Sequence, residues 1–196
     1  LVMLNDGSKG SITIGGAVSP AGGNFEEPVT QATLKVVGAF LALSRDRANA
    51  RRYPSIHPLD SWSNYRSTVS SEQVALARQI LKSGNDIEQM MKVIGEEGTP
   101  NDDFVTYLKS EFLDAVYLQQ DTFDKVDSSC TAERQAYVFG KLSGILRMPF
   151  HFSDKGAARR YFADLRQIFV DWNYSAWKSP EFAENEKKLD EKLSEA

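Results

Sequence analysis

The chain has 196 residues, of which 41% are hydrophobic and 26% charged, an ordinary composition for a globular protein. Its net charge of −4 includes no basic excess, which argues against a nucleic-acid-binding protein. The single cysteine, Cys130, excludes an intrachain disulfide and fits a reducing compartment. No apolar run approaches the ~18 residues that a membrane-spanning helix needs. The first ten residues lack the basic start of a signal peptide. We therefore expect any membrane association to go through partners.

The first 28 residues have the pattern of β structure followed by a loop. Residues 2–4 and 11–18 are apolar and rich in β-branched side chains, and the DGSKG sequence between them favours a turn, so we predict a β hairpin. Residues 19–28, SPAGGNFEEP, are predicted to be a Gly/Pro loop. The first strand fits either a natural start or a cut through a larger sheet. Exposed strand edges pair with other chains, so we expect dimerisation or disorder at residues 1–20.

The pattern becomes helical after this loop. Pro28 and Thr30 suit a helix start, and apolar residues continue at helical spacing to about residue 50. Residues 51–65, RRYPSIHPLDSWSNY, contain two prolines, each of which favours extended geometry in the residue before it. A non-helical connection is therefore predicted there.

From about residue 70 the chain is predicted to consist of helices and short turns. We expect a helix over Ser71–Leu81 to close at Gly84 and the next to begin at a capping box of Asp86 and Gln89. Residues 95–103 are predicted to be a loop. Further helices are predicted at residues 104–116, 131–146 and 154–169, and after Ser179-Pro180. The predicted fold class is mainly α, a helical bundle preceded by a small β piece.

Motifs for independent catalysis are missing from the sequence. Gly140-Lys141 lacks the upstream glycine of a phosphate loop and is followed by Leu142 instead of a hydroxyl residue. His57 and His151 do not have metal-ligand spacing to each other or to the cysteine. Cys130 lies in no nucleophile motif. We therefore predict no catalytic residue and no metal site.

Four segments carry a resemblance to one known family. Residues 11–31, SITIGGAVSPAGGNFEEPVTQ, resemble the junction between the nucleotide-binding and C-terminal domains of the catalytic A subunit of V/A-type rotary ATPases. Three further segments are similar to that family in the same order, whereas the last 60 residues match weakly. These segments are RRYPSI at 51–56, VIG at 93–95 with the acidic loop after it, and YLQQDTFD at 117–124.

The resemblance implies a parent protein that couples ATP hydrolysis or synthesis to H⁺ or Na⁺ movement. It implies ATP or ADP with Mg²⁺ as the parent's cofactors, and B subunits and central-stalk rotor subunits as partners. The parent would be cytoplasmic and peripheral on the membrane. In that family the phosphate loop, catalytic glutamate and magnesium ligands lie upstream of these segments. We therefore expect this chain alone to be inactive and to hold no nucleotide tightly.

The resemblance also implies a domain organisation. Residues 1–28 would be the end of the nucleotide-binding domain, a remnant of its β structure. Residues 29–65 would form a connecting helix and a Pro-rich segment, and residues 66–196 the helical C-terminal domain.

By the same resemblance, several residues are expected to line an adenine pocket. Adenine is a flat ring that aromatic side chains stack on. The family supplies such side chains from separate segments, and Gln and Thr would lie at the edge of the pocket. The expected residues are Phe25, Tyr53, Gln120, Thr122 and Phe123. Without the resemblance, each aromatic residue would be read as part of the core.

A second implied surface faces the central stalk. The loop from Ile94 to Asp103, IGEEGTPNDD, carries the acidic residues Glu96, Glu97, Asp102 and Asp103. An acidic loop suits a basic rotor surface through long-range attraction, and the alternative is an ordinary solvated turn. Asp102 and Asp103 also suit the start of a helix. Residues 57–63, HPLDSWS, are similar to the beta subunit of F-type ATPases, which suggests a bacterial V/A-type branch.

Two other readings stay open. The chain could be a free-standing helical interaction module that docks through the last helix, with Phe182, Leu189 and Leu193 on its apolar side. It could also be a regulatory protein that binds nucleotides through the aromatic residues alone.

Overall fold

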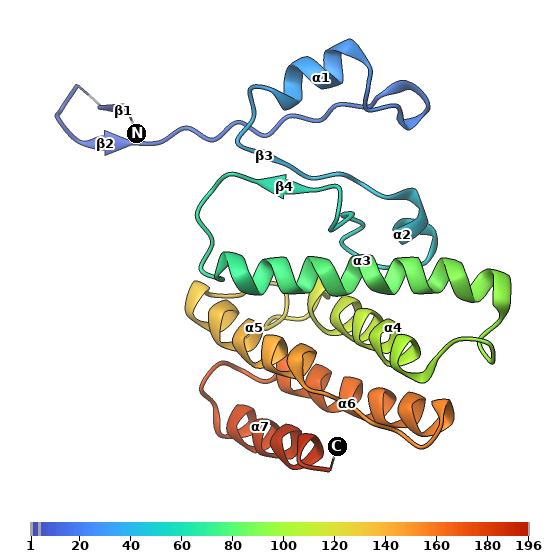
Figure 1. Ribbon diagram of the computed structural model, residues 1–196. Coiled ribbons are helices and arrows are strands. Elements are labelled where there is room, and N and C mark those ends of the chain that lie inside the picture. Colours follow the sequence, from blue (N-terminus) through green and yellow to red (C-terminus); the bar gives the residue numbers. More distant parts are fainter. Residues whose placement is uncertain (1, 4, 196) are drawn as a thin grey trace. The chain divides into compact units, whose positions relative to one another are not determined.

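The structure, a computed structural model, describes residues 2–3 and 5–195. They form two compact units, one ending at Phe40 and the other beginning at Leu41. The described chain is mainly helical with short strands at its front, so the predicted fold class is confirmed (Figure 1). We call the two parts the N-terminal unit and the helical unit.

The N-terminal unit contains a shorter hairpin than predicted. Strand β1 (Val2–Met3) pairs antiparallel with β2 (Lys9–Gly10), and Leu4 of the predicted strand lies outside the described residues. Asp6 closes the turn by accepting hydrogen bonds from the backbone and hydroxyl of Ser8, at 2.9 and 2.7 Å. The predicted strand at 11–18 is wrong: these residues have no regular structure. Ile12 and Ile14 are 80% and 89% exposed, so among the described residues no apolar surface covers this segment and favours a strand there.

The predicted helix through residue 50 is interrupted. The structure has a short 3₁₀ turn η1 (Ala21–Gly23), then α1 (Pro28–Leu34), strand β3 (Ala39–Phe40) and helix α2 (Arg45–Asn49). After β3, Ala42 is 2% exposed while its neighbours Leu41 and Leu43 are 61% and 75% exposed. This alternation belongs to an extended backbone. The β-branched Val36-Val37 pair and Gly38, which follow α1, are weak helix formers.

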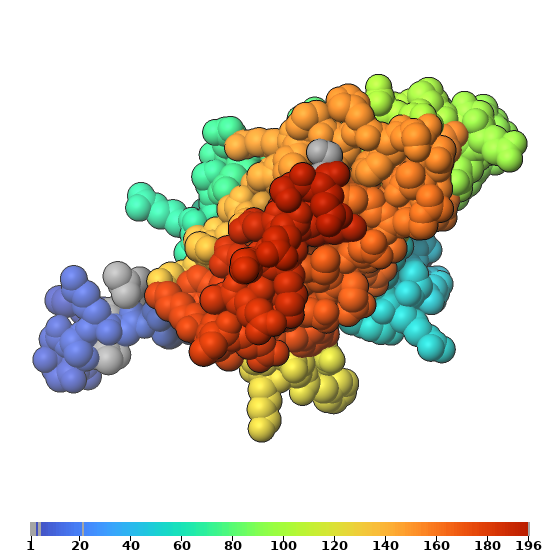
Figure 2. Space-filling view, turned by 90° about the horizontal axis from the view of Figure 1, so that it is seen from below, coloured from blue at the N-terminus to red at the C-terminus, as the bar shows by residue number. Residues whose placement is uncertain are grey.

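The helical unit stacks its long helices in chain order (Figure 1). Helix α3 packs on α4 and α5, α4 packs on α6, and α6 packs on α7. Figure 2 shows α7, in red, lying across α6, in orange. The core between them includes Leu142, Leu165, Phe169, Trp172 and Leu189, none of them measurably exposed. After β4 (Trp62–Ser63), the elements are α3 (Ser71–Ile94), α4 (Asn101–Leu113), the π-helical turn η2 (Asp114–Leu118), α5 (Ala132–Arg147), α6 (Lys155–Tyr174) and α7 (Pro180–Leu193).

Helix α3 runs through the position where the sequence predicts a break. Gly84 does not end the helix but lies buried against Ser110 of α4, where an added Cβ would come within 2.2 Å of the serine Cβ. The glycine therefore serves the close approach of two helices. The capping box forms at Ser70 and Gln73, at the start of α3, and not at Asp86 and Gln89 as predicted.

The later helix starts agree with the sequence. Thr131, Asp154 and Ser179 each accept a hydrogen bond from the backbone N–H three residues on, at 3.3, 2.7 and 3.1 Å. Each satisfies a backbone donor that the first helical turn leaves unpaired. The loop predicted at 95–103 is shorter, because α4 already begins at Asn101.

Candidate functional site

Residues 41–65, which we call the connecting segment, belong to the helical unit and make polar contacts with its helices. Arg78 of α3 donates to the carbonyl oxygens of Pro58 and Leu59, at 2.8 and 2.6 Å. The Ser61 hydroxyl donates to the His57 carbonyl at 2.7 Å and accepts from the Ala42 N–H at 3.0 Å. The two ends of the extended stretch are thereby tied together, which gives an irregular segment a fixed course.

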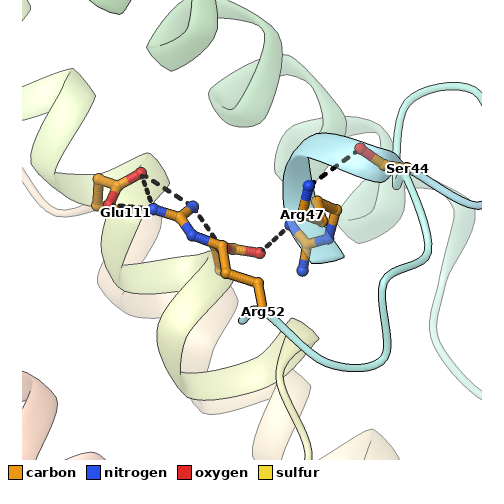
Figure 3. A network of polar contacts seen from close by, with 5 residues as sticks. Ser44, Arg47, Arg52 and Glu111 are labelled. Carbon is orange, nitrogen blue, oxygen red and sulfur yellow. Dashed lines mark hydrogen bonds and ion pairs between the residues drawn. The ribbon is translucent and has the colours of Figure 1, made fainter. Parts of the chain in front are cut away.

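An ion network joins this segment to the end of α4 (Figure 3). The Arg47 Nη1 lies 2.6 Å from one carboxylate oxygen of Asp114, and the Arg52 Nη1 lies 2.7 Å from the other. Arg52 also pairs with Glu111, at 3.0 Å. Ser44 accepts the Arg47 backbone N–H at 3.2 Å and caps α2.

The network is partly shielded from water. The side chains of Asp114 and Arg47 are 5% and 11% exposed, whereas those of Arg52 and Glu111 are about one-third exposed, at 35% and 39%. Burial acts to lower the pKa of Arg52, but the adjacent Glu111 and Asp114 carboxylates outweigh it and raise that pKa. The two positive and two negative charges balance, as buried ion pairs require. Among the described residues, no acceptor bonds the buried Nε and Nη2 of Arg47.

Next to this network, two predicted site segments meet. The backbone N–H of Gln120 donates to the carbonyl oxygen of Tyr53 at 2.9 Å, across 67 positions of the sequence. Both aromatic side chains beside this bond are open to solvent: Tyr53 is 55% and Phe123 is 96% exposed. Gln120 and Thr122 are exposed as well. We call Tyr53, Gln120, Thr122 and Phe123 the aromatic surface.

The loop that carries Phe123 is shaped by its own carboxylates. Asp121 accepts the Phe123 N–H at 2.9 Å, and Asp124 accepts the N–H groups of Val126 and Asp127, both at 2.8 Å. Asp127 in turn accepts the Asp121 N–H at 2.6 Å, and burial raises its pKa. The segment after η2, in yellow, projects from the helical unit in Figure 2. The loop therefore has a defined backbone while its aromatic side chain makes little contact with the rest of the unit.

A pocket of about 320 Å³ lies beside the aromatic surface and shares Gln120 with it. Its walls come from the connecting segment, η2, the following loop, α5 and the end of α6. Burial raises the pKa of Tyr117 to about 12 and also raises the pKa of the Cys130 thiol, so both groups are neutral at pH 7. The volume of this pocket is at the low end of the range for small-molecule sites. The lining residues are Pro54, Ile56, Pro58, Val116–Gln120, Val126, Asp127, Cys130, Arg134, Gln135, Val138 and Asn173.

Phe25, the remaining predicted aromatic, belongs to the N-terminal unit. Its ring packs edge-on against Phe40, with centroids 5.6 Å apart, and the side chain is 38% exposed. It is a partly exposed aromatic of that unit.

The acidic turn, residues 95–100 between α3 and α4, is fastened to α6. Lys155 donates to the carbonyl oxygens of Glu96 and Glu97, and Arg159 forms an ion pair with the Glu96 carboxylate. Glu96 is therefore locally neutralised, whereas Glu97 and Asp102 make no ion pair within the part of the chain that the structure describes. Asp103 lies with Asp102 in the first turn of α4.

The same end of α3 exposes apolar side chains. Val93 is 85% and Ile94 is 49% exposed in the last turn of α3. The acidic turn thus lies next to an apolar patch, which the helical periodicity could not reveal.

Sequence reasoning missed the residues that hold the site together. Arg47, Arg52, Glu111 and Asp114 pair across about 60 positions, which no local pattern shows. The loop carboxylates Asp121 and Asp124 do carry a local signal, since an aspartate that bonds a backbone N–H two or three residues later favours a turn.

Neither a metal site nor a membrane span can be assigned. Across residues 2–3 and 5–195, no three His, Cys, Asp or Glu side chains are grouped so that they could hold a metal ion. In the same part of the chain, every helix is too short or too polar to cross a membrane.

Two family models match the chain, and together they span both units. Residues 2–63 match the nucleotide-binding domain of the ATP synthase alpha/beta family. Residues 71–147 match the C-terminal domain of V and A type ATP synthase. A subunit of the ATP synthase from Nanoarchaeum equitans, NeqB, shares the fold with a TM-score of 0.54 and 17% identity, over 64% of this chain and 32% of that one. The class is thus that of ATP synthase subunits with a helical C-terminal domain.

Curated relatives narrow this class. The chain is 57% identical over its whole length to the V-type ATP synthase alpha chain of Treponema denticola. It is 55% identical over 96% of its length to the V-type ATP synthase alpha chain 1 of Treponema pallidum, and 53% identical over 99% to the alpha chain of Borreliella burgdorferi. The chain belongs to the V-type ATP synthase alpha chains and corresponds to their C-terminal part. It spans about a third of the length of these relatives, at 33%, 32% and 34%.

Proposed function

We propose that this chain is the adenine-facing and rotor-facing part of a catalytic subunit that couples ATP hydrolysis or synthesis to H⁺ or Na⁺ movement. The parent would use ATP or ADP with Mg²⁺, and the phosphate and metal chemistry would come from protein outside these 196 residues. The chain by itself would not hydrolyse ATP. The complex would lie on the membrane through its partners.

The hydrogen bond between Gln120 and Tyr53 carries this proposal. It joins two segments that each present an aromatic side chain to solvent, and exposed aromatic rings are costly unless a ligand or partner covers them. A nucleotide base is a flat ring whose faces such side chains stack on. Phe25 would be a further aromatic contact of the base in the parent subunit, and Gln120 and Thr122 would bond the edge of the base.

The test is the hydrolysis of MgATP by the assembled complex containing the full-length subunit. We expect Tyr53→Ala and Phe123→Ala each to raise the KM for MgATP roughly 2- to 10-fold, since a stacking contact contributes about 0.5–1.5 kcal/mol. The value of kcat should change less, because the base is remote from the phosphates. Tyr65→Ala removes an aromatic side chain that is 72% exposed and lies outside the aromatic surface, and serves as the matched control. Unchanged KM values in both test variants would refute the pocket assignment.

We propose further that the acidic turn and the exposed Val93 and Ile94 contact the central stalk, and that B subunits flank the parent subunit. Glu97 and Asp102 would attract a basic rotor surface, and the apolar pair would pack on it. A cysteine introduced at Glu97 should cross-link to a stalk subunit in the assembled complex. A cysteine at Glu184, on the exposed face of α7, should not. Equal yields from both would contradict this contact.

The exposed segment 11–18 supports a third proposal, self-association of this chain. Ile12 and Ile14 present apolar side chains on an extended backbone, which can pair with a second copy. Light scattering should show dimers that Ile12→Lys with Ile14→Lys abolishes. A strict monomer before substitution would count against the proposal.

A further inference from the structure

We infer that Asp114 is a positioning residue for the nucleotide base. It fixes the position of the Tyr53 backbone relative to the loop that carries Phe123. The inference rests on the proposed adenine-facing function of the aromatic surface. It assigns a role to a buried carboxylate that touches no part of the proposed pocket itself.

Asp114 acts through two of its own groups. Its carboxylate holds Arg47 on one oxygen and Arg52 on the other, at 2.6 and 2.7 Å. Its backbone carbonyl accepts the N–H of Gln119 at 3.2 Å and so closes η2 directly before Gln120. Asp114 therefore fixes both Arg52, which precedes Tyr53, and Gln119, which precedes Gln120. Short π-helical turns of this kind are found frequently at functional sites.

The side chain of Tyr53 cannot hold this position by packing, because more than half of it is exposed. Helix α2, with five residues, is too short to be stable without an anchor. The anchor is electrostatic: Asp114 forms ion pairs with Arg47 and Arg52 of the connecting segment, and Arg52 also pairs with Glu111 (Figure 3). Loss of the Asp114 charge would leave two guanidinium groups close together with only Glu111 to balance them. Repulsion between the two guanidinium groups would then displace the connecting segment next to Tyr53, whose position the base contact requires.

The geometry predicts a specific functional consequence. Displacement of Tyr53 relative to Gln120 should weaken the binding of the base and leave the binding of phosphates unchanged. A merely structural defect would weaken both alike or reduce the amount of folded complex. The two inhibitors ADP and inorganic pyrophosphate separate these cases, since pyrophosphate carries the diphosphate group without base or ribose.

The experiment compares variants of the full-length subunit in the assembled complex. Inhibition constants of ADP and pyrophosphate against MgATP hydrolysis are measured for the unaltered protein, Tyr53→Ala, Asp114→Asn and Asp114→Glu. Glu72→Gln removes an ion pair with Arg147 in which the Glu72 side chain is 82% exposed, and is the control. We expect Tyr53→Ala and Asp114→Asn to raise the ADP constant about 3- to 10-fold, in the range of one stacking contact, with the pyrophosphate constant unchanged. Asp114→Glu, which keeps the charge, should recover part of the loss.

A second readout needs no activity. In the 196-residue chain, Asp114→Asn should accelerate hydrogen exchange of the Gln120 amide, whose acceptor is Tyr53, relative to amides in the middle of α6. If Asp114→Asn does not assemble, Arg52→Lys serves in its place. It keeps the Arg47–Asp114 pair and the charge but loses the two-pronged contact of Arg52.

Each outcome decides the inference. A raised ADP constant in Tyr53→Ala with no change in the Asp114→Asn or Arg52→Lys variant overturns the role of Asp114 and leaves the proposed function standing. Equal rises for ADP and pyrophosphate in the Asp114→Asn or Arg52→Lys variant also overturn it. If Tyr53→Ala changes neither constant, the adenine-facing function fails and this inference fails with it.

Discussion

The helical unit buries apolar side chains in a core, whereas the N-terminal unit exposes several of its own. In the helical unit, Leu165, Phe169 and Trp172 of α6 are not measurably exposed, and the helices around them enclose one continuous core. In the N-terminal unit, Ile12, Ile14 and Val36 are each at least 80% exposed. Both units contain apolar residues in regular patterns, but only one of them can bury its pattern within the described chain.

This difference shows which unit can be stabilised by contacts within the described chain. Burial of apolar area is the main favourable term in folding, so the helical unit has its own source of stability. The strand-like segment 11–18 has the propensity of a strand without a face to pack on, and propensity alone does not form a strand. We therefore expect the stability of the described chain to reside in the helical unit. Three sets of substitutions test this comparison.

The largest effect is expected for the centre of the helical core. Phe169→Ala removes a ring that packs edge-on against Phe112 and Trp172, and should lower the free energy of unfolding by about 3–5 kcal/mol. Ile14→Ala, in the N-terminal unit, should change it by less than about 0.5 kcal/mol. Urea unfolding followed by helical circular dichroism measures both. Similar losses in the two variants would mean that the exposed segment is as important for folding as the core.

A smaller effect is expected where α3 and α4 approach closely. Gly84→Ala would place a methyl group 2.2 Å from Ser110 Cβ, so the helices must move apart, at a cost of about 1–3 kcal/mol. Gly144→Ala, inside α5 with nothing within 4 Å of the new Cβ, should instead stabilise by about 0.5–1 kcal/mol. Both changes can be measured as shifts in thermal melting.

Ser110→Gly sharpens this test. It removes the atoms that Gly84→Ala would meet, so the double variant should recover part of the lost stability. Additive losses in the double variant would place the strain somewhere other than at this contact.

The smallest effect concerns pH and the start of α6. The backbone N–H of Ala157 and the hydroxyl of Ser153 donate to Asp154 and hold its pKa below the ordinary value of 3.8. A group whose folded pKa is lowered stabilises the protein above its unfolded pKa and loses that contribution as pH falls through the folded pKa. Asp154→Asn should therefore be less stable than the unaltered chain at pH 6 and nearly equal to it below the folded pKa. A constant difference between pH 6 and pH 2 would show that the charge is not responsible.

Sequence patterns predicted the helical part of the molecule well where the signal was local. Thr131, Asp154 and Ser179 each start a helix as predicted, because a cap needs only the residues within one turn. The same patterns failed at Gly84 and at residues 11–18. Gly84 does not end a helix but allows the close approach of α4, because it packs against Ser110, which lies in that other helix. Whether an apolar segment becomes a strand depends on a partner surface.

The candidate site divides in the same way. Tyr53, Gln120, Thr122 and Phe123 could be named from the sequence because their segments resemble a known family. The structure adds the hydrogen bond that joins the two segments and the ion network beside it. The roles of these four residues remain predictions, as do those of Phe25 and of the acidic residues Glu96, Glu97, Asp102 and Asp103. Their neighbours Lys155, Arg159 and Phe40 could not be identified from local spacing.

By itself, the sequence determined the fold class and most helix starts, since these depend on composition, periodicity and interactions within one turn. The family came from segments of the sequence that resemble known relatives. Only the tertiary structure decided that α3 is one helix, that Val93 and Ile94 are exposed, and that Asp114 joins Arg47 to Arg52. Those features depend on groups that lie far apart along the chain, and their energy exists only once the helices have brought those groups together.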